Sequence, residues 1–224
     1  MWLFLLAVAI NATQLRDCAL RIDGEGIRPV AGEQVLPHDA TCFTQGLFVS
    51  DGVLYESCGH YGKSSLRRYN ATTLELLNRV AVDRRYFLEG ISLVNNTLVA
   101  LTWRERTALL FDPETLELRA TLPFPKEGWG LAAAGSRLFA TSGSAFVDEI
   151  TLGESIEIAS SRQIMRWGKA VPKLNELEIV GERLFINVWF KDYVLVARMD
   201  TGEVVGELTC RVQREGEDEV MNGI

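Results

Sequence analysis

A pattern of roughly forty residues recurs four times along the chain, and such a repeat constrains the fold more than any single motif. The copies are FTQGLFVSDGVLYES (43–57), FLEGISLVNNTLVALTW (87–103), EGWGLAAAGSRLFATSG (127–143) and LNELEIVGERLFINVW (174–189). The matched positions, Gly46, Gly90, Gly130 and Glu176, are 44, 40 and 46 residues apart, and MNGI begins a further unit at Gly223. The chain therefore consists of four complete units and the start of a fifth.

Each unit is divided by turn residues into about four short strands. In the first unit, LFVS, VLYES, SSLRRYN and ELLNRVAV are separated by Asp-Gly, by CGHYGK and by ATTL. Four strands of five or six residues with short turns fill about 40 residues, the size of one propeller blade. No amphipathic helix of convincing length is present, so we predict an all-β fold, a β-propeller.

Charge excludes one class of partner. The 224 residues have a net charge of -7 and a pI near 5.0, without a run of Lys or Arg that would attract phosphates locally. We therefore expect no binding of nucleic acid.

The first ten residues, MWLFLLAVAI, form an apolar run too short to span a bilayer but long enough for the core of a secretory signal. We assign residues 1–17 to a signal peptide or N-terminal extension and residues 25–224 to the propeller domain; a buried first strand is the alternative. Asn-x-Ser/Thr triplets at Asn11, Asn70 and Asn95 agree with a secreted glycoprotein, free of the membrane once the signal is removed.

The cysteines and histidines do not suggest a metal site. Cys18, Cys42, Cys58 and Cys210 include no C-x-x-C pair, and they allow three disulfide pairings that the sequence does not distinguish. His38 and His60 are the only histidines, so a His-dependent triad or a His-rich metal site is disfavoured.

Different side chains occupy the same place in the repeat, and this variation indicates a functional site. Beside the matched position stand Gln45, Glu89, Trp129 and Asn175. Glycine and acidic residues are also common in ordinary turns, but that explanation does not account for the aromatic residues at equivalent places. These are Phe43, Phe87, Trp103, Trp129 and Trp189. We predict that they meet at the central channel, around a single buried carboxylate whose pKa burial would raise.

Seven motifs carry a resemblance to a known family. PHDATCFTQGL, LYESCGHYGKSSLRRY, YFLEGISL, LTW, EGWGLA, LNELE and NGI occur in the order and spacing of the plant and bacterial glutaminyl cyclases, the glutamine cyclotransferases. This resemblance implies a five-bladed propeller, an aminoacyltransferase that converts the N-terminal glutamine of a peptide or protein into pyroglutamate and releases ammonia. It implies no cofactor and no catalytic metal, and we expect a monomer.

The resemblance also implies roles for individual residues. Glu89 matches the acid that moves a proton between the α-amine and the leaving amide nitrogen, and Gln45 and Asn175 match groups that hold the substrate's carbonyl and amide. The five aromatic residues match the lining of the pocket. Ser142 departs from the family, which usually has Asp there.

The family's final blade, with a pocket lysine in a T-G-K motif, has no counterpart in the chain. We therefore expect an incomplete fifth blade and little or no activity from these 224 residues. Two other functions remain open, a non-catalytic propeller that binds a peptide or glycan and a hydrolytic propeller such as a lactonase.

Overall fold

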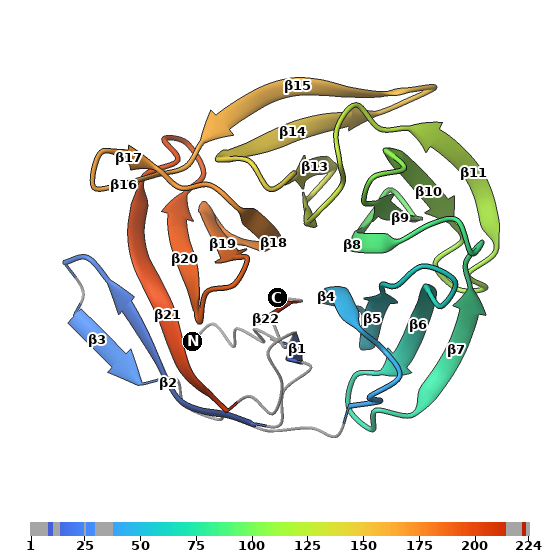
Figure 1. Ribbon diagram of the computed structural model, residues 1–224, viewed down its shortest axis with the longest axis horizontal. Helices are drawn as coiled ribbons and strands as arrows, with labels where there is room; N and C mark the ends of the chain where they lie inside the picture. The colour runs from blue at the N-terminus through green and yellow to red at the C-terminus, as the bar shows by residue number, and fades with distance from the viewer. Residues whose placement is uncertain (1–8, 11–13, 25, 30–37, 214–220, 223–224) are drawn as a thin grey trace.

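The computed structural model describes residues 9–10, 14–24, 26–29, 38–213 and 221–222. Within them, four antiparallel sheets follow one another around a central opening (Figure 1). This confirms the predicted all-β, propeller-like fold; the described residues form four blades, and the predicted fifth blade is not shown. The described residues contain no helix long and apolar enough to cross a membrane. Most of the expected signal segment, and Gly223 of the expected fifth unit, lie outside the described residues.

Each sheet has its first strand nearest the central opening. The first sheet contains β4 (Thr44–Ser50), β5 (Val53–Cys58), β6 (Ser65–Asn70) and β7 (Leu76–Ala81). The second contains β8 (Leu88–Val94), β9 (Thr97–Thr102), β10 (Thr107–Phe111) and β11 (Leu118–Pro123). The third contains β12 (Leu131–Ala134), β13 (Arg137–Ala140), β14 (Phe146–Leu152) and β15 (Ile156–Gln163). The fourth begins with β18 (Leu174–Val180), β19 (Arg183–Val188), β20 (Tyr193–Arg198) and β21 (Val204–Gln213).

The hairpins between the first two strands of a sheet form where turn residues predicted them. Asp51 and Gly52 have φ values of 49° and 75°, and Asn95 and Asn96 have values of 45° and 56°. Two consecutive residues with positive φ match the twist of a two-residue β-hairpin, and Asn, Asp and Gly adopt this conformation most readily. The strand boundaries of the first two units are therefore encoded locally.

Apolar side chains fill the spaces between neighbouring sheets. Leu66 of the first sheet packs with Leu88 and Ile91 of the second, and Leu101 of the second packs with Leu131 of the third. Another cluster joins the third and fourth sheets; it includes Ala132, Phe139, Leu177, Leu184 and Ile186. Burial of these side chains is the main force that holds one blade against the next.

The repeated glycines lie where inner strands of neighbouring blades touch. A Cβ atom on Gly46 would lie 2.9 Å from Gly90 Cα, and one on Gly90 would lie 2.7 Å from Gly130 Cα. A Cβ atom on Gly130 would lie 2.7 Å from Glu176 Cα. Only a residue without a side chain allows the strands to approach so closely, so glycine is required here by contact between blades.

Residues near the N-terminus extend the fourth sheet. β2 (Gln14–Ile22) pairs with β21, and β3 (Gly26–Pro29) pairs with β2. Without β2, the N–H and C=O groups along the outer edge of β21 would be unpaired, and such an open edge accepts another strand. β1 (Ala9–Ile10) pairs with β22 (Met221–Asn222).

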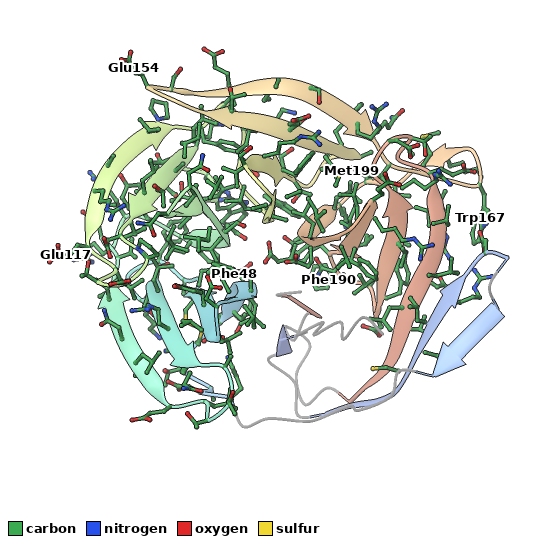
Figure 2. All side chains as sticks on the ribbon, turned by 180° about the vertical axis from the view of Figure 1, so that it is seen from behind. Phe48, Glu117, Glu154, Trp167, Phe190 and Met199 are labelled. Carbon is green, nitrogen blue, oxygen red and sulfur yellow. A yellow bond between two sulfur atoms is a disulfide. The ribbon has the colours of Figure 1, made fainter. Side chains whose placement is uncertain are left out.

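A hairpin that the sequence interpretation did not identify connects the third and fourth sheets. It consists of β16 (Met165–Arg166) and β17 (Lys169–Ala170), and Trp167 at its tip is 80% exposed (Figure 2). The Arg166 guanidinium lies 4.2 Å from the centre of the Trp167 ring.

One disulfide fixes the beginning of the first sheet. Cys42 and Cys58 are bonded, which resolves part of the pairing that the sequence left open. Close to this bond, the buried Glu56 carboxylate accepts a hydrogen bond of 2.6 Å from Thr44 and lies 2.6 Å from His38 Nε2. The buried Arg67 guanidinium binds the Asp39 carboxylate at 2.8 Å.

We predict that Gly90→Ala lowers the free energy of unfolding by at least about 2 kcal/mol, because the new methyl group would lie 2.4 Å from the backbone nitrogen of Leu131. Urea unfolding followed by tryptophan fluorescence measures the change. Gly153→Ala is the matched control, since its nearest neighbour would lie 3.8 Å away, and it should have almost no effect. Equal stability of the two variants would contradict the contact-based explanation.

Candidate active site

Three of the predicted polar residues lie at irregularities in the inner strands. The register shifts between Thr44 and Gly46 in β4, between Leu88 and Ile91 in β8, and between Leu174 and Leu177 in β18. These β-bulges contain Gln45, Glu89 and Asn175, which are 6%, 7% and 5% exposed. A bulge redirects a side chain out of the regular alternation, so the same distortion prepares all three positions.

Hydroxyl groups on the second strand of a sheet, or directly after it, fix the backbone at these bulges. Ser57 Oγ accepts a hydrogen bond from Gly46 N at 2.8 Å and donates one to the carbonyl oxygen of Glu89 at 2.5 Å. Thr141 Oγ1 accepts from Gly130 N at 2.8 Å and donates to the carbonyl oxygen of Asn175 at 2.6 Å. Each hydroxyl therefore connects two blades at a candidate site residue.

The Glu89 carboxyl is in an environment that disfavours its charge. Burial raises its pKa well above the ordinary value, and the negative charges of Glu176, Glu105 and Glu127 add to the rise. This agrees with the prediction that burial would raise the pKa of Glu89. A carboxyl with a raised pKa can hold a proton near neutral pH, as a general acid requires.

A second buried carboxylate, Glu176, was missed as a candidate. It is 2% exposed, and its Oε1 and Oε2 accept hydrogen bonds from Leu131 N at 3.1 Å and Leu47 N at 3.3 Å. Burial raises its pKa well above the usual range, while the two backbone N–H groups act in the opposite direction. The expectation of a single carboxylate was therefore wrong. The repeat contained a signal for this residue, because the matched position is glycine in the first three units and Glu176 in the fourth.

The predicted aromatic lining forms two groups. In the first, Phe43 stacks on His60 with ring centres 4.4 Å apart, and Phe87 meets Trp103 edge to face at 5.5 Å. Gly59 lies against both Gln45 and Phe87: a Cβ atom there would be 3.0 Å from Gln45 Cγ and 2.5 Å from the Phe87 ring. The structure thus places Gln45 beside the first aromatic group.

The second aromatic group belongs to the third and fourth blades. The rings of Trp129 and Trp189 meet edge to face at 5.5 Å, and the exposed Phe190 lies 4.4 Å from Trp189, beside the central opening (Figure 2). The Lys173 ammonium lies 5.4 Å from the Trp189 ring centre. All five predicted aromatic residues are half-buried, so each keeps part of its surface accessible to a ligand.

Tyr61 and Glu105 connect the first and second blades beside Phe87. Tyr61 donates a hydrogen bond of 2.7 Å to Glu105 Oε1, and Phe87 N donates one of 3.3 Å to Glu105 Oε2. The Tyr61 ring meets Phe87 edge to face at 5.5 Å. Neither Tyr61 nor Glu105 was predicted as a site residue, because neither lies at a repeated position.

One group of potential metal ligands occurs among the described residues, and its chemistry does not suit a metal ion. His38, Cys42 and Glu56 have ligand atoms within 4.8 Å of one another. However, Cys42 Sγ is bonded to Cys58 and cannot act as a thiolate. Glu89 and Glu176 do not belong to this group.

The fold and these contacts define a class of protein: a β-propeller with buried carboxyl and amide side chains on its inner strands, flanked by half-buried aromatic rings. The sequence profile described as glutamine cyclotransferase matches residues 7–224. The chain belongs to the glutamine cyclotransferase family.

Known proteins of this family are similar in sequence and structure. The chain is 32% identical over 176 residues to a protein named glutaminyl-peptide cyclotransferase from Arabidopsis thaliana, a match that covers 76% of this chain and 53% of the relative. The chain thus spans about half the length of this relative. The crystal structure of Myxococcus xanthus glutaminyl cyclase matches with a TM-score of 0.69 and 27% identity, covering 76% of this chain and 72% of that chain.

A more distant structure shares the fold alone. The nidogen/laminin complex matches with a TM-score of 0.58 at 11% identity, covering 92% of this chain and 96% of that chain.

We predict that Glu105→Gln lowers the pKa of Tyr61, which partial burial and the Glu105 carboxylate now raise from 10.0 to about 12. The neutral amide removes a negative charge that opposes formation of tyrosinate. Ultraviolet titration of tyrosinate measures the change, and Tyr61→Phe identifies the step that belongs to Tyr61. An unchanged step in Glu105→Gln would show that Glu105 does not control this tyrosine.

Proposed function

We propose that the protein converts the N-terminal glutamine of peptides or proteins into pyroglutamate and releases ammonia. The observation that carries this proposal is Glu89, a buried carboxyl with a raised pKa at a bulge of an inner strand, in a chain that belongs to the glutamine cyclotransferase family. The Arabidopsis and Myxococcus proteins, whose names state this activity, support it.

The reaction needs one proton to move between two nitrogens. The neutral α-amine attacks the side-chain amide carbon, a carbon–nitrogen bond forms and closes a five-membered ring, and the bond to the leaving nitrogen breaks. The attacking nitrogen loses one proton and the leaving nitrogen gains one, so that it departs as ammonia. Because the attack is intramolecular and the α-amine has a pKa near 8, the harder task is protonation of the leaving group.

Glu89 is the group that we assign to this proton transfer. It would accept the proton of the attacking amine and donate it to the leaving nitrogen. Gln45 and Asn175 would hold the carbonyl and amide of the substrate, since both are buried amides on inner strands. The aromatic residues Phe43, Phe87, Trp103, Trp129 and Trp189 would line the pocket and exclude water. No step in this mechanism requires a metal or another cofactor.

Secretion and modification are part of the proposal. The Cys42–Cys58 disulfide supports an oxidising compartment. Asn95 is exposed in a hairpin turn and could carry a glycan, whereas Asn70 is half-buried and its Oδ1 accepts hydrogen bonds from Thr72 N and Thr73 N. Asn11 lies outside the described residues. A five-bladed ring and a monomeric state are also part of the proposal.

The direct test is to incubate the protein with a glutamine-initiated dipeptide and to measure both ammonia release and binding. Ammonia and a pyroglutamyl product support the proposed function. Binding without ammonia favours the alternative, a non-catalytic propeller that binds peptides. Because we expect little or no activity from these 224 residues alone, the deciding sample is a form extended past Ile224. A folded extended form that neither binds the dipeptide nor releases ammonia would contradict both functions.

In an active form of the protein, we predict that Glu89→Gln reduces kcat by about two to four orders of magnitude, because the amide keeps the volume of the side chain but transfers no proton. Steady-state ammonia release measures the effect, and circular dichroism checks that the fold is intact. A variant within about threefold of the parent would rule out Glu89 as the proton carrier.

We also predict that cyclisation survives exhaustive chelation. The candidate ligands His38, Cys42 and Glu56 include a disulfide sulfur, and the proposed steps use side chains alone. Ammonia release is measured before and after dialysis against a chelator, with circular dichroism as the control for folding. Activity that returns only when Zn²⁺ is added to a folded, chelated sample would overturn the metal-free mechanism.

A further inference from the structure

We propose that Glu176 is a positioning residue whose negative charge, fixed at the centre of the ring by two backbone N–H groups, keeps a proton on the Glu89 carboxyl. This inference deepens the proposed function and rests on it, because the proposed function assigns proton transfer to Glu89.

The location of the Glu176 carboxylate is defined by the strands on either side of β8. Its two oxygens bind Leu47 N of β4 and Leu131 N of β12. Leu47 follows Gly46 and Leu131 follows Gly130, the two glycines whose backbones touch Gly90. Gly90 directly follows Glu89, so the carboxylate is held between the two strands that flank the backbone of Glu89.

Hydrogen bonding decides which of the two carboxyls is ionised. A backbone N–H that points at a carboxylate stabilises the charged form, and Glu176 accepts two such bonds. In the part of the chain that the structure describes, the Glu89 carboxyl receives no such bond. When two buried carboxyls interact, their protons dissociate in two successive steps. We therefore assign the first dissociation to Glu176, which leaves its charge to oppose the second dissociation, that of Glu89.

Other charged groups act in the same direction. Burial is the largest cause of the raised pKa of Glu89. The negative charge of Glu176 raises this pKa further, and the charges of Glu105 and Glu127 contribute less. Glu178 lies near Glu176 and itself has a pKa raised to about 7. The hydroxyl of Tyr61 is another titratable group that interacts with Glu89.

The consequence for catalysis follows from the ordinary acidity of glutamate. An exposed glutamate is almost entirely ionised near neutral pH and has no proton to give to the leaving nitrogen. Burial and a neighbouring negative charge both raise the pKa of Glu89, so its carboxyl keeps a proton more readily than an exposed glutamate and can exchange it with the substrate's nitrogens.

Carbon-13 NMR titration of the glutamate carboxyls tests this directly and does not depend on activity. Glu89→Gln and Glu176→Gln identify the two resonances. In the parent protein, Glu176 should titrate before Glu89 as the pH rises. In Glu176→Gln, the pKa of Glu89 should fall by about one unit or more, because a neighbouring like charge is removed.

Thr141→Val is the matched control for loss of a contact between blades. It keeps the volume of the side chain and removes the hydrogen bonds to Gly130 N and the Asn175 carbonyl, but it changes no charge. It should reduce stability and leave the pKa of Glu89 within about 0.3 unit of the parent value, because the charges around Glu89 are unchanged. An equal shift in the control and in Glu176→Gln would overturn the proposal, as would a parent protein in which Glu89 titrates first.

The parent titration supplies a result even if Glu176→Gln does not fold. In an active protein, Glu89→Gln identifies the limb of the kcat/KM pH profile that belongs to Glu89, because this variant abolishes it. That limb should move to lower pH in Glu176→Gln and keep its position in Thr141→Val. A fall in the pKa of Glu89 without any cyclisation would support the charge interaction and reject the proposed function. Cyclisation with an unshifted Glu89 would reject the role of Glu176 alone.

Discussion

The close approach of the inner strands is the constraint on which the rest of this structure depends. Gly46, Gly90 and Gly130 place backbone against backbone at successive blades, and Glu176 occupies the same position in the fourth blade. Its side chain reaches back to the first and third blades through Leu47 N and Leu131 N. At the inner strands, neighbouring backbones therefore touch because glycine has no side chain, and the Glu176 carboxylate joins the fourth blade to the first and the third.

The hydrogen bonds from Leu47 N and Leu131 N lower the cost of burying the Glu176 carboxylate. A buried carboxylate without partners is strongly unfavourable, whereas two backbone donors compensate part of that cost. Glu176 therefore has a structural reason to be present, while the Glu89 carboxyl receives no hydrogen bond from any residue that the structure describes. In natural proteins a buried group of this kind is commonly retained for its chemistry, because packing alone would favour an apolar side chain.

The sequence predicted the parts of this fold that are decided locally. Asp51–Gly52 forms the expected hairpin turn, Asn95–Asn96 forms the equivalent turn of the second unit, and the four-strand units follow from the spacing of such turns. Pairing of β2 with β21 could not be predicted, because it depends on an open sheet edge distant in sequence. The repeat also placed Gln45, Glu89 and Asn175 at equivalent positions, but equivalence does not specify contact. The aromatic residues consequently form two groups, where the repeat alone indicated one.

Glu176 was not predicted as a site residue because the repeat is defined by the residues that its copies share. Glycine occupies the matched position in three units and defines the motif, and Glu176 in the fourth unit was counted as the equivalent of those glycines. Physically it is the opposite, since a glycine contributes by having no side chain and Glu176 contributes through both oxygens of its side chain. A departure from the repeat at a buried position is therefore as informative as its regularity.

The first blade shows how charge can also position an aromatic residue of the site. Arg67 is 2% exposed and binds Asp39 at 2.8 Å and Thr41 at 3.0 Å, while Glu56 lies 2.6 Å from His38. Tyr55 and Leu66 face the second blade, so Glu56 and Arg67, one residue further along their strands, face the opposite side. These bonds and the Cys42–Cys58 disulfide fix residues 38–42 on the sheet. Phe43 follows directly, so the position of its ring beside His60 depends on this network as well as on apolar packing.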